Sequence, residues 1–142
     1  AKPLVDVINR VHQHNTTCAS SFVQAGALAA LTGPQDCVRE MVAEFERRRN
    51  LVINRLEEIP LLSCLKPQGA FYAFINMKET GLEAADLGMR LLQEAGVALV
   101  PGSVFGAQGE GFLRLSFASS YESLEKAMDR IGQFMTSLQA NK

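Results

Sequence analysis

The sequence lacks several features that mark particular classes of protein. It has no tryptophan and only three cysteines, Cys18, Cys37 and Cys64, with no Cys-x-x-Cys pair. An odd cysteine number without that spacing argues against a disulfide framework and a structural zinc site, and fits buried thiols in a reducing cytoplasm. No apolar run approaches the roughly 20 residues of a membrane span, and no signal-peptide pattern is present. We therefore expect a cytoplasmic protein without a membrane partner.

An excess of charge of one sign is also lacking. Fourteen Lys and Arg stand against fifteen Asp and Glu, which leaves a formal charge of −1. No basic surplus is present to attract nucleic acid, so we expect no nucleic-acid partner. The two histidines, His12 and His14, would be separated by about 200° on a helix and could not share a metal ion. We therefore predict no metal site. The chain also starts without Met, which predicts a processed or cut polypeptide.

What the sequence does contain is helical periodicity. With 142 residues, 47% of them hydrophobic, the chain can bury a core of its own. Apolar residues recur at three- and four-residue steps, which is typical of amphipathic helices. Such helices are predicted over 2–14, 18–31, from about 36 to Ile59, 82–95 and from about 119 to Leu138. Capping boxes are predicted at Thr32 with Gln35 and at Ser119 with Glu122, and Gly96 is predicted as a C-cap.

Two of these helices carry unusual faces. Segment 18–31 is apolar nearly all round, so it must be covered by something, either in this chain or outside it. The run Arg47–Arg49 could form an anion patch, but consecutive helical residues point in different directions. We favour a solvated charged face for this run.

Strand patterns fill the space between the later helices. Short strands are predicted at 63–65, 71–77, 97–100 and 112–117, where aromatic and β-branched residues gather. Phe71 and Ala73 would share one face of their strand while Tyr72 and Phe74 share the other, so both faces are expected to be covered. The predicted fold is α/β (α+β), with a small mixed sheet of about three to four short strands packed by helices.

One charged residue interrupts a strand. Alternation places Leu113 and Leu115 on one face of the last strand and Arg114 on the other. A guanidinium fork matches a carboxylate or phosphate through two parallel hydrogen bonds, so Arg114 is either a ligand-binding residue or part of an internal salt bridge. The loop 101–111 before it holds four glycines, which permit tight turns and close approach of the backbone to something bulky. An ordinary long connection is the alternative for this loop.

Four ordered motifs together resemble a known family. They are QAGALAAL at 24–31, KPQGAFY at 66–72, VPGSVFG at 100–106 and LRLSFA at 113–118. This set resembles the C-terminal portion of class I/II pyridoxal-phosphate-dependent aminotransferases, nearest the aspartate aminotransferase branch. The resemblance implies a fold-type-I transaminase that is normally a homodimer. It further implies that residues 1–33 are terminal helices of the large cofactor domain and bridge, and that 34–142 are the C-terminal small domain.

The resemblance also implies roles for individual residues. Arg114 matches the family arginine that grips the substrate α-carboxylate, and Phe71, Tyr72, Gly102, Ser103 and Phe105 match the wall of the substrate pocket. The parent would use pyridoxal 5′-phosphate to exchange an amino group between an amino acid, aspartate-like by resemblance, and a 2-oxo acid. The family's Schiff-base lysine lies upstream of the stretch that matches this chain. We therefore expect no catalytic residue and no bound cofactor here, and an inactive chain.

Two other functions remain open. A stand-alone module of the same fold could use Arg114 to bind a carboxylate ligand. Alternatively, the apolar segment 18–31 could be an oligomerisation surface, and for a fragment with that surface uncovered we expect self-association.

Overall fold

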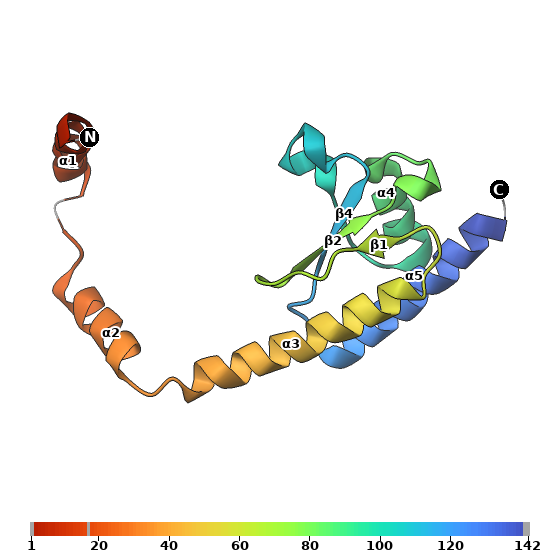
Figure 1. The fold of residues 1–142 in the computed structure, drawn as a ribbon, viewed down its shortest axis with the longest axis horizontal. Coiled ribbons are helices and arrows are strands. Elements are labelled where there is room, and N and C mark those ends of the chain that lie inside the picture. The colour runs from red at the N-terminus through yellow and green to blue at the C-terminus, as the bar shows by residue number, and fades with distance from the viewer. Residues whose placement is uncertain (1, 17, 141–142) are drawn as a thin grey trace. The chain divides into compact units, whose positions relative to one another are not determined.

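The computed structural model describes residues 2–16 and 18–140, and the chain divides into two compact units between Arg39 and Glu40. The first unit contains helices α1 (Lys2–Asn15) and α2 (Ser21–Thr32), drawn in red and orange in Figure 1. Neither helix has a buried residue. On α2 the side chains of Phe22 and Leu31 are 78% and 82% exposed. The apolar surface predicted for segment 18–31 is therefore present, and the described residues of the first unit leave it exposed.

The long helix α3 (Asp36–Glu57) starts without the predicted capping box. The Thr32 hydroxyl donates a hydrogen bond back to the Leu28 carbonyl oxygen at 2.8 Å. The Gln35 side-chain amide donates to the carbonyl oxygens of Ala30 and Gly33. The prediction was wrong because both side chains hydrogen-bond back to carbonyl oxygens near the end of α2 and do not cap the start of α3.

The second unit is built on a four-stranded sheet in the order β1-β2-β4-β3. Its strands are β1 (Ser63–Cys64), β2 (Tyr72–Asn76), β3 (Val100–Pro101) and β4 (Phe112–Ser116). All three pairings are antiparallel, so the sheet is not the mixed one that was predicted. The α/β (α+β) class itself is confirmed. In the register, Phe74 of β2 and Val100 of β3 both pair with Arg114 of β4.

Strand β3 is shorter than the predicted strand 97–100, because Val97 belongs to the closing turn of the preceding helix. Helix α4 (Ala84–Ala95) ends at Gly96, whose φ of 66° is the left-handed conformation that glycine adopts readily. This confirms Gly96 as the C-cap. The Val97 amide then donates to the Leu91 carbonyl oxygen at 3.0 Å, which places Val97 in the closing turn of the helix.

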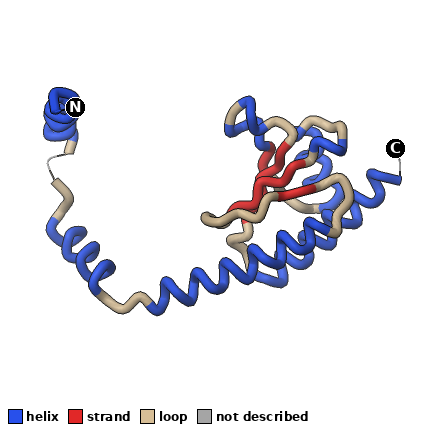
Figure 2. Tube along the Cα trace, viewed as in Figure 1, coloured by secondary structure: helices blue, strands red, loops and turns tan. Residues whose placement is uncertain are grey.

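Only one face of the sheet joins the core. Ala73, Ile75, Leu113 and Leu115 are at most 3% exposed. They form one cluster with buried side chains of α3, α4 and α5 (Tyr121–Ala140). Figure 2 draws the strands of this sheet in red and the helices in blue. Phe74 on the other face is 39% exposed. The prediction that both faces are covered is therefore wrong for the described residues.

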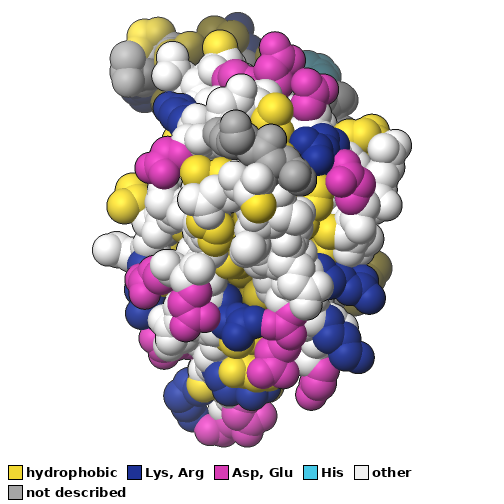
Figure 3. All heavy atoms as spheres, turned by 90° about the vertical axis from the view of Figure 1, so that its right-hand side faces the viewer, with side chains coloured by type: hydrophobic (Ala, Val, Ile, Leu, Met, Phe, Trp, Pro, Cys, Tyr) yellow, Lys and Arg dark blue, Asp and Glu magenta, His cyan; other side chains and the backbone are white. Residues whose placement is uncertain are grey.

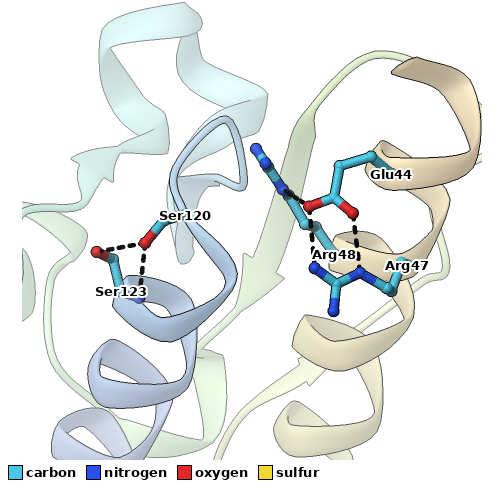
Figure 4. Close-up of polar contacts among 5 residues, drawn as sticks. All are labelled: Glu44, Arg47, Arg48, Ser120 and Ser123. Atoms are coloured by element: carbon cyan, nitrogen blue, oxygen red, sulfur yellow. Dashed lines mark hydrogen bonds and ion pairs between the residues drawn. The ribbon is translucent and has the colours of Figure 1, made fainter. Parts of the chain in front are cut away.

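The N-cap of helix α5 is Ser120, one residue after the predicted cap at Ser119. The Ser120 side-chain oxygen accepts a hydrogen bond from the Ser123 amide at 3.2 Å, as Figure 4 shows. This is the bond expected of an N-cap serine. The capping box predicted at Ser119 and Glu122 is therefore wrong, and the cap is a serine one position later.

The arginine run of α3 is tied to acidic partners. Glu44 accepts hydrogen bonds from Arg47 at 2.8 Å and from Arg48 at 2.6 Å (Figure 4). Arg49 pairs with Glu46, and the Arg48 and Arg49 side chains are only 22% and 19% exposed. The solvated-face interpretation is wrong for these two residues, because Arg48 also lies over the Phe45 ring and Arg49 also donates to the Pro67 carbonyl oxygen. On the face drawn in Figure 3, basic and acidic side chains are interspersed and neither sign predominates.

The three cysteine thiols differ in their exposure. Cys18 and Cys37 are exposed, so the expectation of buried thiols is wrong for them. Cys64 is half-buried, and burial raises the pKa of its thiol.

Among the residues that the structure describes, no helix has the length and apolar character that crossing a bilayer requires.

The Glu44 cluster predicts a pH-dependent stability. The two arginine hydrogen bonds lower the pKa of Glu44 from 4.5 to about 2. Because this pKa is depressed in the folded state, the stabilisation is complete above pH 4.5 and is lost as the pH falls toward 2. We expect Glu44→Gln to lower the free energy of unfolding at pH 7 and to lower it less at pH 3. Urea unfolding followed by circular dichroism measures the free energy of unfolding of both proteins. A difference between the unchanged chain and Glu44→Gln that is the same at pH 7 and pH 3 would contradict the prediction.

Candidate functional site

The candidate site is centred on Arg114, which strand β4 holds on the open face of the sheet. Leu113 and Leu115 are 1% and 3% exposed and anchor the strand in the core. Because side chains alternate along a strand, this anchoring directs Arg114 to the opposite face. The predicted alternation is confirmed. The backbone position of Arg114 is fixed on both sides, since β4 lies between β2 and β3.

Two aromatic rings hold the guanidinium of Arg114. Its central carbon lies 4.4 Å from the centroid of the Tyr72 ring and 4.6 Å from that of the Phe105 ring. Cation–π contacts of this kind contribute about 0.5–2 kcal/mol each, more when water is excluded. The rings thus hold a permanent cation in place without neutralising it.

Among the described residues, the guanidinium of Arg114 has no acidic partner. Within residues 2–16 and 18–140, Arg114 forms no ion pair, and its buried Nε has no hydrogen-bond partner. The internal salt bridge considered from the sequence is therefore not observed there. A buried donor without an acceptor costs about 1–3 kcal/mol, which an incoming carboxylate or phosphate would recover. The arrangement is suited to binding an anion.

The aromatic surroundings extend beyond the predicted residues. The Phe74 ring stacks on the Phe112 ring at 5.0 Å and meets the Phe105 ring edge-on at 6.5 Å. Tyr72, Phe74 and Phe112 also line an open cavity of about 490 Å³ that extends to Cys64 of β1. Sequence reasoning did not identify Phe74 or Phe112 as part of the site. The period-two spacing of Phe74 from Tyr72, and of Phe112 from Arg114, was the available signal.

The remaining predicted wall residues lie at different distances from the guanidinium. Gly102 is buried and begins the 3-10 helix η2 (Gly102–Phe105), which carries Phe105, and Ser103 of the same turn is exposed. The Phe71 ring packs on Phe45 of α3 at 6.0 Å and on Tyr72 at 4.4 Å. The structure therefore gathers Arg114, Tyr72 and Phe105, and places Phe71 beside Tyr72 on the side of α3.

The glycine-rich loop is compact. It forms η2 and a second 3-10 turn, η3 (Ala107–Gly109), which fold against one another. A Cβ atom on Gly102 would overlap the Gly109 carbonyl oxygen and lie 2.9 Å from the Phe74 ring. The close approach expected from the sequence is therefore largely between two glycine backbones. The Phe74 ring is a bulky group that also lies close to Gly102 in this turn.

Glu110 follows this loop and was not identified from the sequence. Its carboxylate accepts hydrogen bonds from the amides of Ala84 at 3.0 Å and Gly111 at 3.1 Å. These bonds, the one from Ala84 first, lower the pKa of Glu110, with a smaller effect from the Ser103 side chain. A lone acidic residue between two glycines, directly before the strand of Arg114, was the signal that could have pointed to it.

None of the described lysines lies in the setting that an imine with a pyridoxal cofactor requires. A lysine that forms an imine with the cofactor needs a lowered pKa, which desolvation or a neighbouring cation provides. The lysines within the described ranges, Lys2, Lys66, Lys78 and Lys126, are all exposed. The Lys78 amine lies 4.9 Å from the centroid of the Phe112 ring. In the same ranges, no three His, Cys, Asp or Glu side chains gather as metal ligands would.

Comparison with known proteins agrees with this geometry. The profile of the family "Aminotransferase class I and II" matches residues 2–131. "Aromatic-amino-acid aminotransferase 2" of Thermococcus litoralis is 45% identical over 130 residues, and an aspartate aminotransferase of Pyrococcus abyssi is 44% identical over 130. Each alignment covers 90% of this chain and 33% of the relative.

Solved structures give the same result. The aromatic aminotransferase from Pyrococcus horikoshii superposes with a TM-score of 0.84 at 42% identity, over 92% of this chain and 35% of that one. The aspartate aminotransferase from Rhizobium meliloti gives 0.80 at 38% identity, over 92% and 35%. The chain thus spans about a third of the length of these relatives. Its sequence and fold show that it belongs to the class I and II aminotransferase family.

Proposed function

We propose that this chain is the C-terminal part of a pyridoxal-phosphate-dependent aminotransferase and provides its substrate-carboxylate site. The observation that carries the proposal is the guanidinium of Arg114, which is held between two rings and has no acidic partner among the described residues. Residues 1 to about 33 would be terminal helices of the large domain and bridge, and the rest the small domain. The parent would be a cytoplasmic homodimer.

In this proposal Arg114 binds the α-carboxylate of the amino acid or 2-oxo acid. Two parallel N–H donors match the two carboxylate oxygens, so the substrate is oriented as well as bound. Tyr72 and Phe105 restrict the guanidinium, and with Phe71 and the turn at Gly102 and Ser103 they form the wall that excludes water. Because the relatives include an aromatic-amino-acid and an aspartate aminotransferase, aromatic amino acids and aspartate are the substrates to be tested.

The chain by itself is proposed to be inactive. The exposed lysines Lys2, Lys66, Lys78 and Lys126 support this, because none lies in the desolvated setting that an imine-forming amine needs. The groups that hold pyridoxal phosphate would lie in the remaining part of the parent. An alternative, a stand-alone carboxylate-binding module, is favoured only by the free anion site at Arg114.

Incubation with pyridoxal phosphate tests the inactivity. After reduction with borohydride, we expect mass spectrometry to show scattered adducts well below one per chain, and we expect no transamination of aspartate with 2-oxoglutarate. Stoichiometric attachment at one lysine together with turnover would refute the proposal. Saturable calorimetric binding of a dicarboxylate without turnover would favour the binding module.

The uncovered apolar helix α2 supports a second expectation, self-association. Phe22, Leu28 and Leu31 are 78%, 63% and 82% exposed, and removing such side chains from water favours association. We expect sedimentation velocity to show species larger than a monomer, and Phe22→Glu with Leu31→Glu to reduce them. A strictly monomeric chain at high concentration would contradict this.

A chimera tests the role of Arg114 directly. This chain would replace the matching segment of the Thermococcus litoralis relative, to which it is 45% identical. We expect Arg114→Ala to raise KM for the amino acid at least about tenfold, since hydrogen bonds to a charged group contribute about 1.5–3 kcal/mol. Arg114→Lys would recover part of this, because it keeps the charge but not the paired donors.

The matched control for this experiment is Arg90→Ala. Arg90 lies on α4 and pairs with Glu94 at 2.8 Å, so its removal deletes an arginine of the same unit without altering the site. Its KM should equal that of the parent chimera. Equal KM values for the Arg114→Ala and Arg90→Ala chimeras would remove the basis of the proposal.

A further inference from the structure

We propose that Glu110 is a positioning residue for Arg114. By tying the turn that carries Phe105 to the start of helix α4, its carboxylate keeps the Phe105 ring against the guanidinium. The inference rests on the proposed function of Arg114 as the carboxylate site. It adds a residue that touches neither the substrate nor the guanidinium and acts through the aromatic wall.

The first observation is that helix α4 takes its cap from a distant residue. Glu83 occupies the N-cap position but makes no side-chain capping bond. The Ala84 amide donates instead to Glu110, 26 positions along the chain, and the same carboxylate oxygen also accepts the Gly111 amide. Amides at a helix N-terminus lack partners within the helix and favour a negative group. Glu110 therefore joins α4 to the end of the glycine-rich loop.

The second observation is that the loop folds as one short unit ending at Glu110. The Gly106 amide donates to the Ser103 carbonyl oxygen, and the Gly109 amide to that of Gly106. The Glu110 amide donates to the Ala107 carbonyl oxygen at 3.3 Å. Because Gly102 and Gly109 pack backbone to backbone, a shift at Glu110 would be passed to η2. Phe105 is the last residue of η2.

The third observation is that Phe105 has little packing of its own to hold it. Its side chain is 53% exposed, and its ring contacts are with Arg114 at 4.6 Å and Phe74 at 6.5 Å. The ring position over Arg114 therefore depends on the backbone of the turn. Glu110 anchors that backbone to a helix whose buried residues, Leu87 and Leu91 among them, lie in the core.

Nitrogen-15 NMR of the full chain tests this inference through the Arg114 Nε–Hε signal. Aromatic rings this close shift that signal, so it reports the ring positions directly. Phe105→Leu sets the scale, because it removes one of the two rings. We expect Glu110→Ala to reproduce most of that change, and Glu110→Gln, which keeps one acceptor oxygen for the Ala84 amide, to reproduce only a small part.

The matched control is Ser120→Ala, which deletes the N-cap of α5 but does not touch the loop. We expect it to leave the Arg114 signal unchanged. If Glu110→Ala moves the Ala84 amide signal and not that of Arg114, Glu110 is only a helix cap and the inference is overturned. If Glu110→Ala does not fold, Glu110→Gln decides, since a partial shift supports the inference and an unchanged signal overturns it. The chimera experiment tests Arg114 itself, so the two failures are distinguishable.

Discussion

The structure depends on a guanidinium that is partly withdrawn from water and has no acidic partner among the described residues. An arginine guanidinium in a protein does not lose its proton, so the cost of burying one is not relieved by neutralisation. Tyr72 and Phe105 offset part of this cost through their ring faces, but their rings accept no conventional hydrogen bond from the buried Nε. The unmet demand for an acceptor is what a substrate carboxylate would satisfy.

The rest of the domain explains why this arrangement persists. The antiparallel sheet gives one face to the core, where Leu113 and Leu115 lock the register of β4, and leaves the other face to Arg114 and its aromatic neighbours. The loop that supplies Phe105 is tied at its end by Glu110 to helix α4. The open face of the sheet therefore carries a cation on a strand anchored in the core and, by our inference, a Phe105 ring whose position depends on Glu110.

Much of this could be predicted from local sequence signals. Periodicity located the helices, Gly96 ended α4 as expected, and alternation along 112–117 placed Arg114 opposite the core. Interactions between distant segments were not predictable in the same way. The cap of α4, for example, comes from Glu110, 26 positions away. Local signals can also mislead, since Thr32 and Gln35 hydrogen-bond back to α2 and do not cap α3. The sheet proved antiparallel because strand direction depends on how the segments connect in space, which residue spacing does not specify.

The candidate site likewise contains residues that the sequence predicted and residues that it did not. Arg114, Tyr72 and Phe105 belong to motifs that the family resemblance identified, and the structure brings them together. Phe74 and Phe112 went unnoticed because an aromatic residue in a strand usually signals core packing. Here they lie on the face that the chain leaves open.

The most direct test of the central claim compares two substrates that differ only in the carboxylate. In the chimera with the Thermococcus litoralis relative, kcat/KM would be measured for an amino acid and for the amine that lacks its α-carboxylate, with Arg114 and with alanine in its place. The account predicts that the substitution lowers kcat/KM for the amino acid and leaves that for the amine unchanged, so that discrimination between them is lost. An equal loss for both substrates, or no loss for either, would contradict it.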